Sequence, residues 1–157
     1  MVPSYHCAME TLLWLVTMAV FPVLGALAFL GKRWAYVTFV VLGILFFPAR
    51  VGFHFHPQPC ECALTIPLAL FSLTKYWHIV LFAIFFLLTS VQARGYRARA
   101  QYLIAAGAVM AMGVYVELAE GLTGKGHCRL RDLVPDAAGA LVGSLVLFFL
   151  RKSRKED

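Results

Sequence analysis

Long apolar runs separated by short basic turns are the feature that most limits how this chain can fold. Hydrophobic residues make up 61% of its 157 residues and charged residues only 14%, whereas a typical soluble domain carries about 25% charged residues. An apolar run of roughly 20 residues is long enough for a helix to cross the hydrocarbon core of a bilayer. The sequence therefore predicts an all-α integral membrane protein.

The third apolar run of the chain is too long to form one straight transmembrane helix. As one helix, Leu64 to Val91 would extend roughly 42 Å at about 1.5 Å per residue, which exceeds the bilayer core. Pro67 and Lys75 mark the expected break. We therefore predict a short interfacial or re-entrant segment over 64–73, on the outer side, and a span over 75–92. With the other apolar runs this gives a bundle of about five transmembrane helices. The other four runs are 11–31, 34–49, 101–120 and 132–150.

The positions of the basic residues predict the orientation of these helices. Nine of the fourteen basic residues fall in the turns at 32–33, 94–99 and 151–155. Because cytoplasmic loops carry an excess of Lys and Arg, these turns are expected in the cytoplasm, with the N-terminus outside. The remaining basic residues and all histidines and cysteines then lie on the outer side. Clusters of this kind, between apolar runs, argue against nucleic acid as a partner.

The stretch from 117 to 143 concentrates acidic residues near the outer side. Glu117 and Glu120 are three positions apart, and Asp132 and Asp136 are four apart, so the members of each pair share a helix face. An ionisable group in mid-membrane costs on the order of 3 kcal/mol, so these carboxylates need a partner or water. One interpretation is an internal salt-bridge network that only orients the turn. The other, favoured by the number of charges from three helices, is a polar site in the outer leaflet. The residues concerned are Glu117, Glu120, Asp132 and Asp136, with Lys125, Arg129 and Arg131 between them.

Small residues define one face of the last expected helix. Gly139 and Gly143 lie on the same face as Asp136. Small residues let transmembrane helices approach closely. We therefore expect this face to pack against the helix that bears Glu117 and Glu120.

The same acidic residues form a spacing pattern that resembles the carboxy-terminal signature of VanZ-like membrane proteins. In this chain the pattern consists of Glu117, Glu120, Asp132, Asp136, Gly139 and Gly143. A second element of that family resembles Thr74, Lys75 and His78 at the start of the preceding helix. The chain departs from the family at Glu120, Asp136, Thr74 and Gly126, where the family has Gln, Asn, an acid and Arg.

The resemblance covers roughly residues 36–150 and implies a location more than a reaction. No linker divides the chain, so we predict one membrane domain over 1–157. Within it, the resemblance implies a VanZ-like core at 34–150, preceded by an additional N-terminal transmembrane helix within 1–33. It also implies a multi-pass protein of the cell envelope, similar to a family associated with low-level resistance to the glycopeptide teicoplanin.

The leading functional hypothesis is binding of an anionic or zwitterionic envelope component, such as a lipid-linked intermediate. Lys75 and Arg129 are expected to hold its phosphate or carboxylate, while Asp132 and Asp136 orient these cations. The predicted site comprises Lys75, His78, Glu117, Glu120, Arg129, Asp132 and Asp136. An alternative is a membrane-embedded hydrolase or transferase in which His78 acts with Glu117, beside Glu120, as an acid/base pair. Whether the protein is an enzyme, and its oligomeric state, stay open.

A group of histidines and cysteines in the second outer loop suggests a third class, a metal or thiol-redox module. His54, His56, Cys60 and Cys62 offer N and S donors that suit Zn or Cu. A disulfide between Cys128 and either Cys60 or Cys62 fits an oxidising exterior. Unpaired buried thiols are the third alternative. No other cofactor is predicted.

Overall fold

The computed structural model describes residues 4–51, 53–124 and 127–156, and the predicted positions Lys125 and Gly126 lie outside that description. Side chains at 4–14, 16, 47 and 154–156 also lie outside it. The described residues form helices and no strand, which confirms the all-α prediction. The helices are α1 (Ser4–Phe29), α2 (Arg33–Arg50), α3 (Ile66–Ser72), α4 (Tyr76–Gln92), α5 (Ala98–Thr123), the 3₁₀ helix η1 (Leu130–Asp132) and α6 (Leu133–Glu156).

Two helices of the described part are long and apolar enough to cross a membrane. They are α5 and the segment Leu130–Ser153, which contains η1 and most of α6. Helices α3 and α4 add a third candidate if they count as one broken span, since they are bent by 72° at their junction. In α1 and α2 the apolar stretches Thr17–Phe29 and Arg33–Phe46 are shorter. The fold is therefore that of a helical protein with two or three candidate spans.

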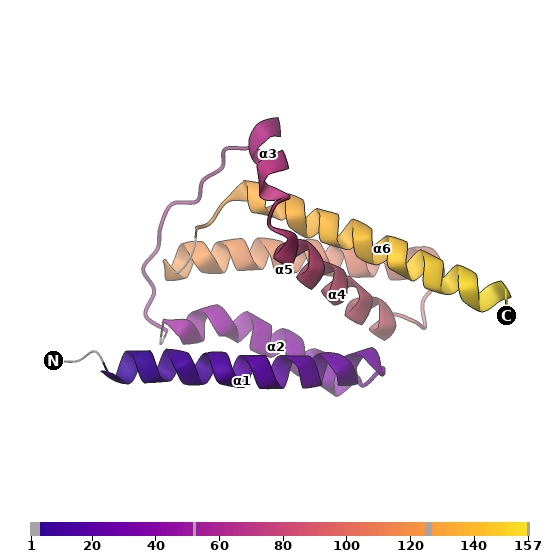
Figure 1. Cartoon of the computed structure of the whole chain (residues 1–157), viewed down its shortest axis with the longest axis horizontal. Coiled ribbons are helices and arrows are strands. Elements are labelled where there is room, and N and C mark those ends of the chain that lie inside the picture. The colour runs from indigo at the N-terminus through magenta and orange to yellow at the C-terminus, as the bar shows by residue number, and fades with distance from the viewer. Residues whose placement is uncertain (1–3, 52, 125–126, 157) are drawn as a thin grey trace.

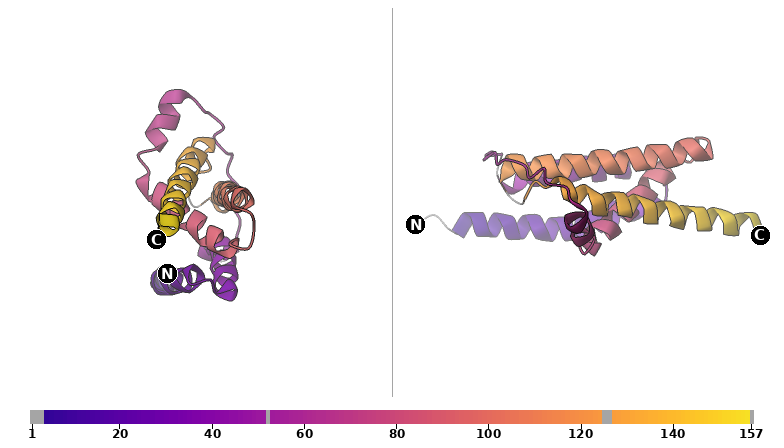
Figure 2. Two further views of the ribbon diagram at one scale, coloured as in Figure 1. Left: turned by 90° about the vertical axis from the view of Figure 1, so that its right-hand side faces the viewer. Right: turned by 90° about the horizontal axis from the view of Figure 1, so that it is seen from above.

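The break between α3 and α4 lies where the sequence predicted it. Helix α3 ends at Ser72, whose hydroxyl lies 3.0 Å from the backbone oxygen of Arg131 near the start of α6. Lys75 then precedes the first residue of α4. Helix α3 projects away from the other helices (Figures 1 and 2). The elbow therefore places Lys75 beside the start of α6.

Helices α4, α5 and α6 pack around a core of aromatic and small side chains. Its buried members are Phe82, Phe85, Phe86, Ala105 and Val109. Helices α1 and α2 lie side by side below this group, and their turn lies at the same end as the α4–α5 turn and the end of α6 (Figure 1). The three basic stretches predicted as turns are therefore at one end of the molecule, although the last of them, 151–155, is the helical end of α6.

The glycine face of α6 packs closely, as predicted, but against α4 instead of α5. A Cβ atom on Gly139 would lie 2.7 Å from the backbone oxygen of Ile79, and one on Gly143 would lie 2.9 Å from the Cβ atom of Phe86. Both neighbours belong to α4. The predicted partner helix was wrong for these two glycines, because periodicity shows which residues share a face and not which helix covers it.

Candidate functional site

Two acid–base pairs join the start of α4 to the start of α6. The Lys75 ammonium forms an ion pair with Oδ2 of Asp132, and Nδ1 of His78 lies 3.1 Å from Oδ1 of Asp136. Lys75 and His78 are three residues apart at the first turn of α4, and the aspartates are four apart, so each set shares a face. Each base therefore meets one acid across the α4–α6 contact. We call Lys75–Asp132 and His78–Asp136 the two acid–base pairs.

The acids are buried and the bases are partly exposed. The side chains of Asp132 and Asp136 are 3% and 1% exposed, whereas those of Lys75 and His78 are 37% and 32% exposed. Both members of the Lys75–Asp132 pair act electrostatically on His78, so the pairs form one cluster. Because the carboxylates face inward, the cluster presents its basic groups outward.

Helix α5 completes the burial of Asp136 through a glycine. A Cβ atom on Gly113 would lie only 2.5 Å from Oδ2 of Asp136. Gly113 lies one helical turn before Glu117 and so shares its face. The sequence analysis did not identify this residue, although a glycine on the acidic face of an apolar helix is a signal for close approach.

Glu117 and Glu120 bind backbone N–H groups of the turn between α5 and α6. The backbone N–H of Arg129 donates to Oε2 of Glu117 at 2.6 Å, and that of His127 donates to Oε2 of Glu120 at 3.0 Å. Helix α5 ends at Thr123, and the next residue, Gly124, adopts the left-handed conformation (φ 63°) typical of a helix C-cap. These two carboxylates therefore fix the turn that leads to Asp132.

Arg129 is held by a residue that the sequence analysis did not identify, Glu61. Arg129 and Arg131 approach the Glu61 carboxylate at 3.1 and 3.0 Å. Asp136, which was expected to orient Arg129 or Lys75, pairs with His78 instead. Charge balance in the sequence could have identified Glu61, because it is the one acid between the second and third apolar runs.

A disulfide joins the loop before α3 to the turn before α6. Of the two predicted pairings, the structure contains Cys60–Cys128. Glu61 and Arg129, next to these cysteines, form an isolated parallel β-bridge. Cys62 is a free, exposed thiol. The loop, the turn and η1 are therefore held as one unit.

The predicted metal ligands do not assemble in the described part of the chain. No group of three or more His, Cys, Asp or Glu side chains there is arranged to hold a metal ion. Cys60 is committed to the disulfide, which removes one thiolate from the predicted set of His54, His56, Cys60 and Cys62. The four donors are thus not brought together.

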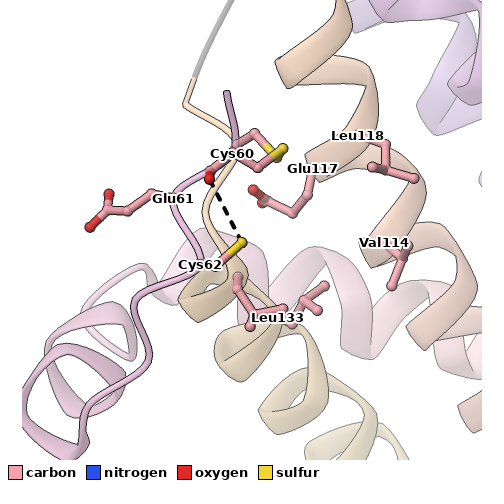
Figure 3. A pocket seen from close by; sticks show the side chains of 9 residues that line it. Cys60, Glu61, Cys62, Val114, Glu117, Leu118 and Leu133 are labelled. Carbon is pink, nitrogen blue, oxygen red and sulfur yellow. Dashed lines mark hydrogen bonds between the residues drawn. A yellow bond between two sulfur atoms is a disulfide. The ribbon is translucent and has the colours of Figure 1, made fainter. Parts of the chain in front are cut away.

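A pocket of about 160 Å³ lies beside the disulfide. The Glu117 side chain projects from α5 toward the loop that carries Cys60 and Cys62 (Figure 3). The remaining lining side chains are mostly apolar. Neither His78 nor Lys75 lines this pocket, and Nδ1 of His78 is hydrogen-bonded to Asp136. The lining residues are Cys60, Glu61, Cys62, Val114, Glu117, Leu118, Cys128, Leu130 and Leu133.

The predicted site residues therefore fall into two groups. Lys75, His78, Asp132 and Asp136 form the two acid–base pairs, while Glu117, Glu120 and Arg129 stabilise the turn beside them. Comparisons with protein-family models, curated proteins and solved structures find no match to this chain. The chemistry available at the site is that of partly exposed bases held by buried carboxylates.

Proposed function

We propose that this chain is a VanZ-like integral membrane protein of the cell envelope that binds an anionic envelope component at the two acid–base pairs. The observation that carries the proposal is the exposure of Lys75 and His78 above the buried Asp132 and Asp136. A Lys ammonium has three N–H donors, and Asp132 engages it on one side. The outward side is available to a phosphate or carboxylate.

The proposal includes five spans, with the N-terminus outside and the C-terminus in the cytoplasm. The basic turns at one end of the molecule support this orientation. Helices α1 and α2 would supply the first two spans. The spacing of the acidic and glycine residues supports the VanZ-like assignment, and with it a role in glycopeptide (teicoplanin) resistance.

Binding of a labelled lipid-linked cell-wall intermediate to the purified protein tests the proposal. Replacing Lys75 alone would leave Asp132 as an uncompensated buried charge and endanger the fold. The informative variant is therefore Lys75→Gln combined with Asp132→Asn, which removes both charges. We expect its affinity to fall at least about tenfold, because a charge-assisted hydrogen bond contributes roughly 1.5–3 kcal/mol.

Arg99→Gln is the matched control for this experiment. Arg99 is an exposed cation in the first turn of α5. It belongs to the basic stretch 94–99 that is expected in the cytoplasm. This variant loses one positive charge and should bind as the unmodified protein does. Equal affinity of the double variant and the unmodified protein would remove the proposal.

A second candidate function is acid–base catalysis, which the His78–Asp136 pair favours. When the Nδ1–H of neutral His78 donates a hydrogen bond to Asp136, Nε2 carries no proton and can act as a base toward water or a substrate hydroxyl. Asp136 orients His78 in this candidate, whereas the sequence analysis considered Glu117 as the acid/base partner of His78. Release of product from a labelled lipid-linked substrate measures this activity. His78→Gln should lower the rate by about 10²- to 10⁴-fold, and unchanged turnover would exclude the enzyme.

A further inference from the structure

The bend between α3 and α4 places an apolar surface directly beside Lys75, the partly exposed base of the Lys75–Asp132 pair. Helix α3 is bent by 72° from α4, and Lys75 lies at the junction. Contacts between Ser72 and Arg131, and between Lys75 and Asp132, attach the elbow to the start of α6. The position of α3 relative to Lys75 is thereby fixed.

The outward surface of α3 is strongly apolar and exposed. Ile66 and Phe71 are 78% and 69% exposed, and Leu70 lies between them in the same helix. Transfer of one such side chain from water to an apolar environment is favourable, so an exposed group of them next to a membrane-spanning segment is suited to lipid chains. Helix α3 projects away from the other helices (Figure 1), which agrees with the exposure of these side chains.

Two aromatic residues mark the level of the lipid headgroups at the same place. Tyr76 and Trp77 follow Lys75 at the start of α4 and are more than half exposed. Trp and Tyr are enriched where a membrane meets water, at the level of the headgroups. In the proposed five-span arrangement Lys75 would therefore lie at the depth of the lipid phosphates, with the apolar surface of α3 beside it.

From this juxtaposition we infer that the anionic component is the phosphate headgroup of a lipid in the outer leaflet, which reaches Lys75 sideways from the bilayer with its chains against α3 and Trp77. The inference rests on the proposed function and names its ligand class. A soluble phosphate compound would use Lys75 but gain nothing from the apolar surface of α3. The Lys75 ammonium and the exposed apolar side chains fit one amphiphilic molecule.

Quenching of Trp77 fluorescence by brominated lipids tests the inference. The full chain carries Trp14→Phe and Trp34→Phe, so that Trp77 is the remaining tryptophan, in nanodiscs of phosphatidylcholine. Either brominated phosphatidylglycerol or brominated phosphatidylcholine is added at equal fraction. We expect roughly fivefold enrichment of phosphatidylglycerol at Trp77, the effect of one cation near the membrane surface.

Two variants test whether Lys75 causes the enrichment of phosphatidylglycerol. In the combined variant Lys75→Gln and Asp132→Asn the enrichment should disappear, whereas Arg99→Gln should keep it. Persistence of the enrichment in the combined variant would overturn the inference. So would a Trp77 signal that no brominated lipid quenches, because the lipid chains would then not reach α3 and Trp77.

A soluble anion separates failure of this inference from failure of the proposed function. Binding of glycerol phosphate to the same nanodiscs, without phosphatidylglycerol, is followed by ³¹P line broadening. Binding that depends on Lys75, without lipid enrichment, retains the anion site and overturns the lipid assignment. If neither the binding of glycerol phosphate nor the enrichment of phosphatidylglycerol depends on Lys75, both the lipid inference and the proposed function are wrong.

Discussion

Gly113 is the residue at which α5 packs against the buried carboxylate of Asp136. A Cβ atom there would lie 2.5 Å from Oδ2 and 3.3 Å from Cγ of Asp136. Atoms do not approach that closely, so Gly113→Ala must displace the Asp136 carboxylate or the helix. Because Asp136 is almost fully buried, we expect the variant to lose about 1 to 3 kcal/mol of stability. Thermal unfolding in detergent measures the loss.

Gly107→Ala provides the matched control on the same helix. A Cβ atom on Gly107 meets nothing within 4 Å among the described residues. Alanine is also a better helix former than glycine by about 0.5–1 kcal/mol. This variant should therefore be as stable as the unmodified protein or slightly more so. Equal stability of the two alanine variants would mean that Gly113 does not restrain Asp136.

At the scale of secondary-structure elements, the disulfide decides how firmly η1 and the start of α6 are held. It cross-links positions 68 residues apart, which restricts the unfolded chain. Replacing both Cys60 and Cys128 by serine should therefore lower stability by about 2 to 4 kcal/mol. Unfolding under non-reducing conditions measures the change.

The free cysteine of the same loop is the control for the disulfide variant. Cys62→Ser removes a thiol that makes no cross-link and should leave the unfolding transition unchanged. Because η1 carries Asp132, the double serine variant should also bind the anionic ligand more weakly. A double variant as stable as Cys62→Ser would show that the salt bridges of Glu61 hold the turn without the disulfide.

The elements themselves were largely predictable from the sequence, whereas their partners were not. The apolar runs and Lys75 located the helices and the α3–α4 break, because apolar length and breaking residues are local properties. The partner of Gly139 and Gly143 depends on how three helices are arranged, which no single periodicity records. The predicted contact with α5 failed for that reason.

In the candidate site, too, some contacts could be predicted from the sequence and others could not. Lys75, His78, Asp132 and Asp136 were expected to lie together, and they form two pairs. Glu117 was expected to face a partner or water, and its partner is the backbone N–H of Arg129. Such a contact depends on the conformation of the turn, which the order of charged residues does not specify.

At the scale of the whole molecule, the proposed orientation places Cys62 outside the cell. Cys62 is exposed on the loop that meets the α5–α6 turn, at the end of the molecule opposite the three basic turns. A maleimide that cannot cross membranes should therefore label Cys62 in intact cells of a Cys7→Ala variant. Cys60 and Cys128 should not react, since their sulfurs form the disulfide.

A second cysteine variant makes the orientation test decisive. Arg97→Cys, in a chain that also carries Cys7→Ala and Cys62→Ser, places a thiol in the exposed α4–α5 turn. That thiol should react only after the cells are permeabilised, because an excess of Lys and Arg keeps such turns in the cytoplasm. The reverse labelling pattern would place Lys75 and His78 on the cytoplasmic side. Lipids of the outer leaflet could not then reach them, whereas the contacts within the two acid–base pairs would be unaffected.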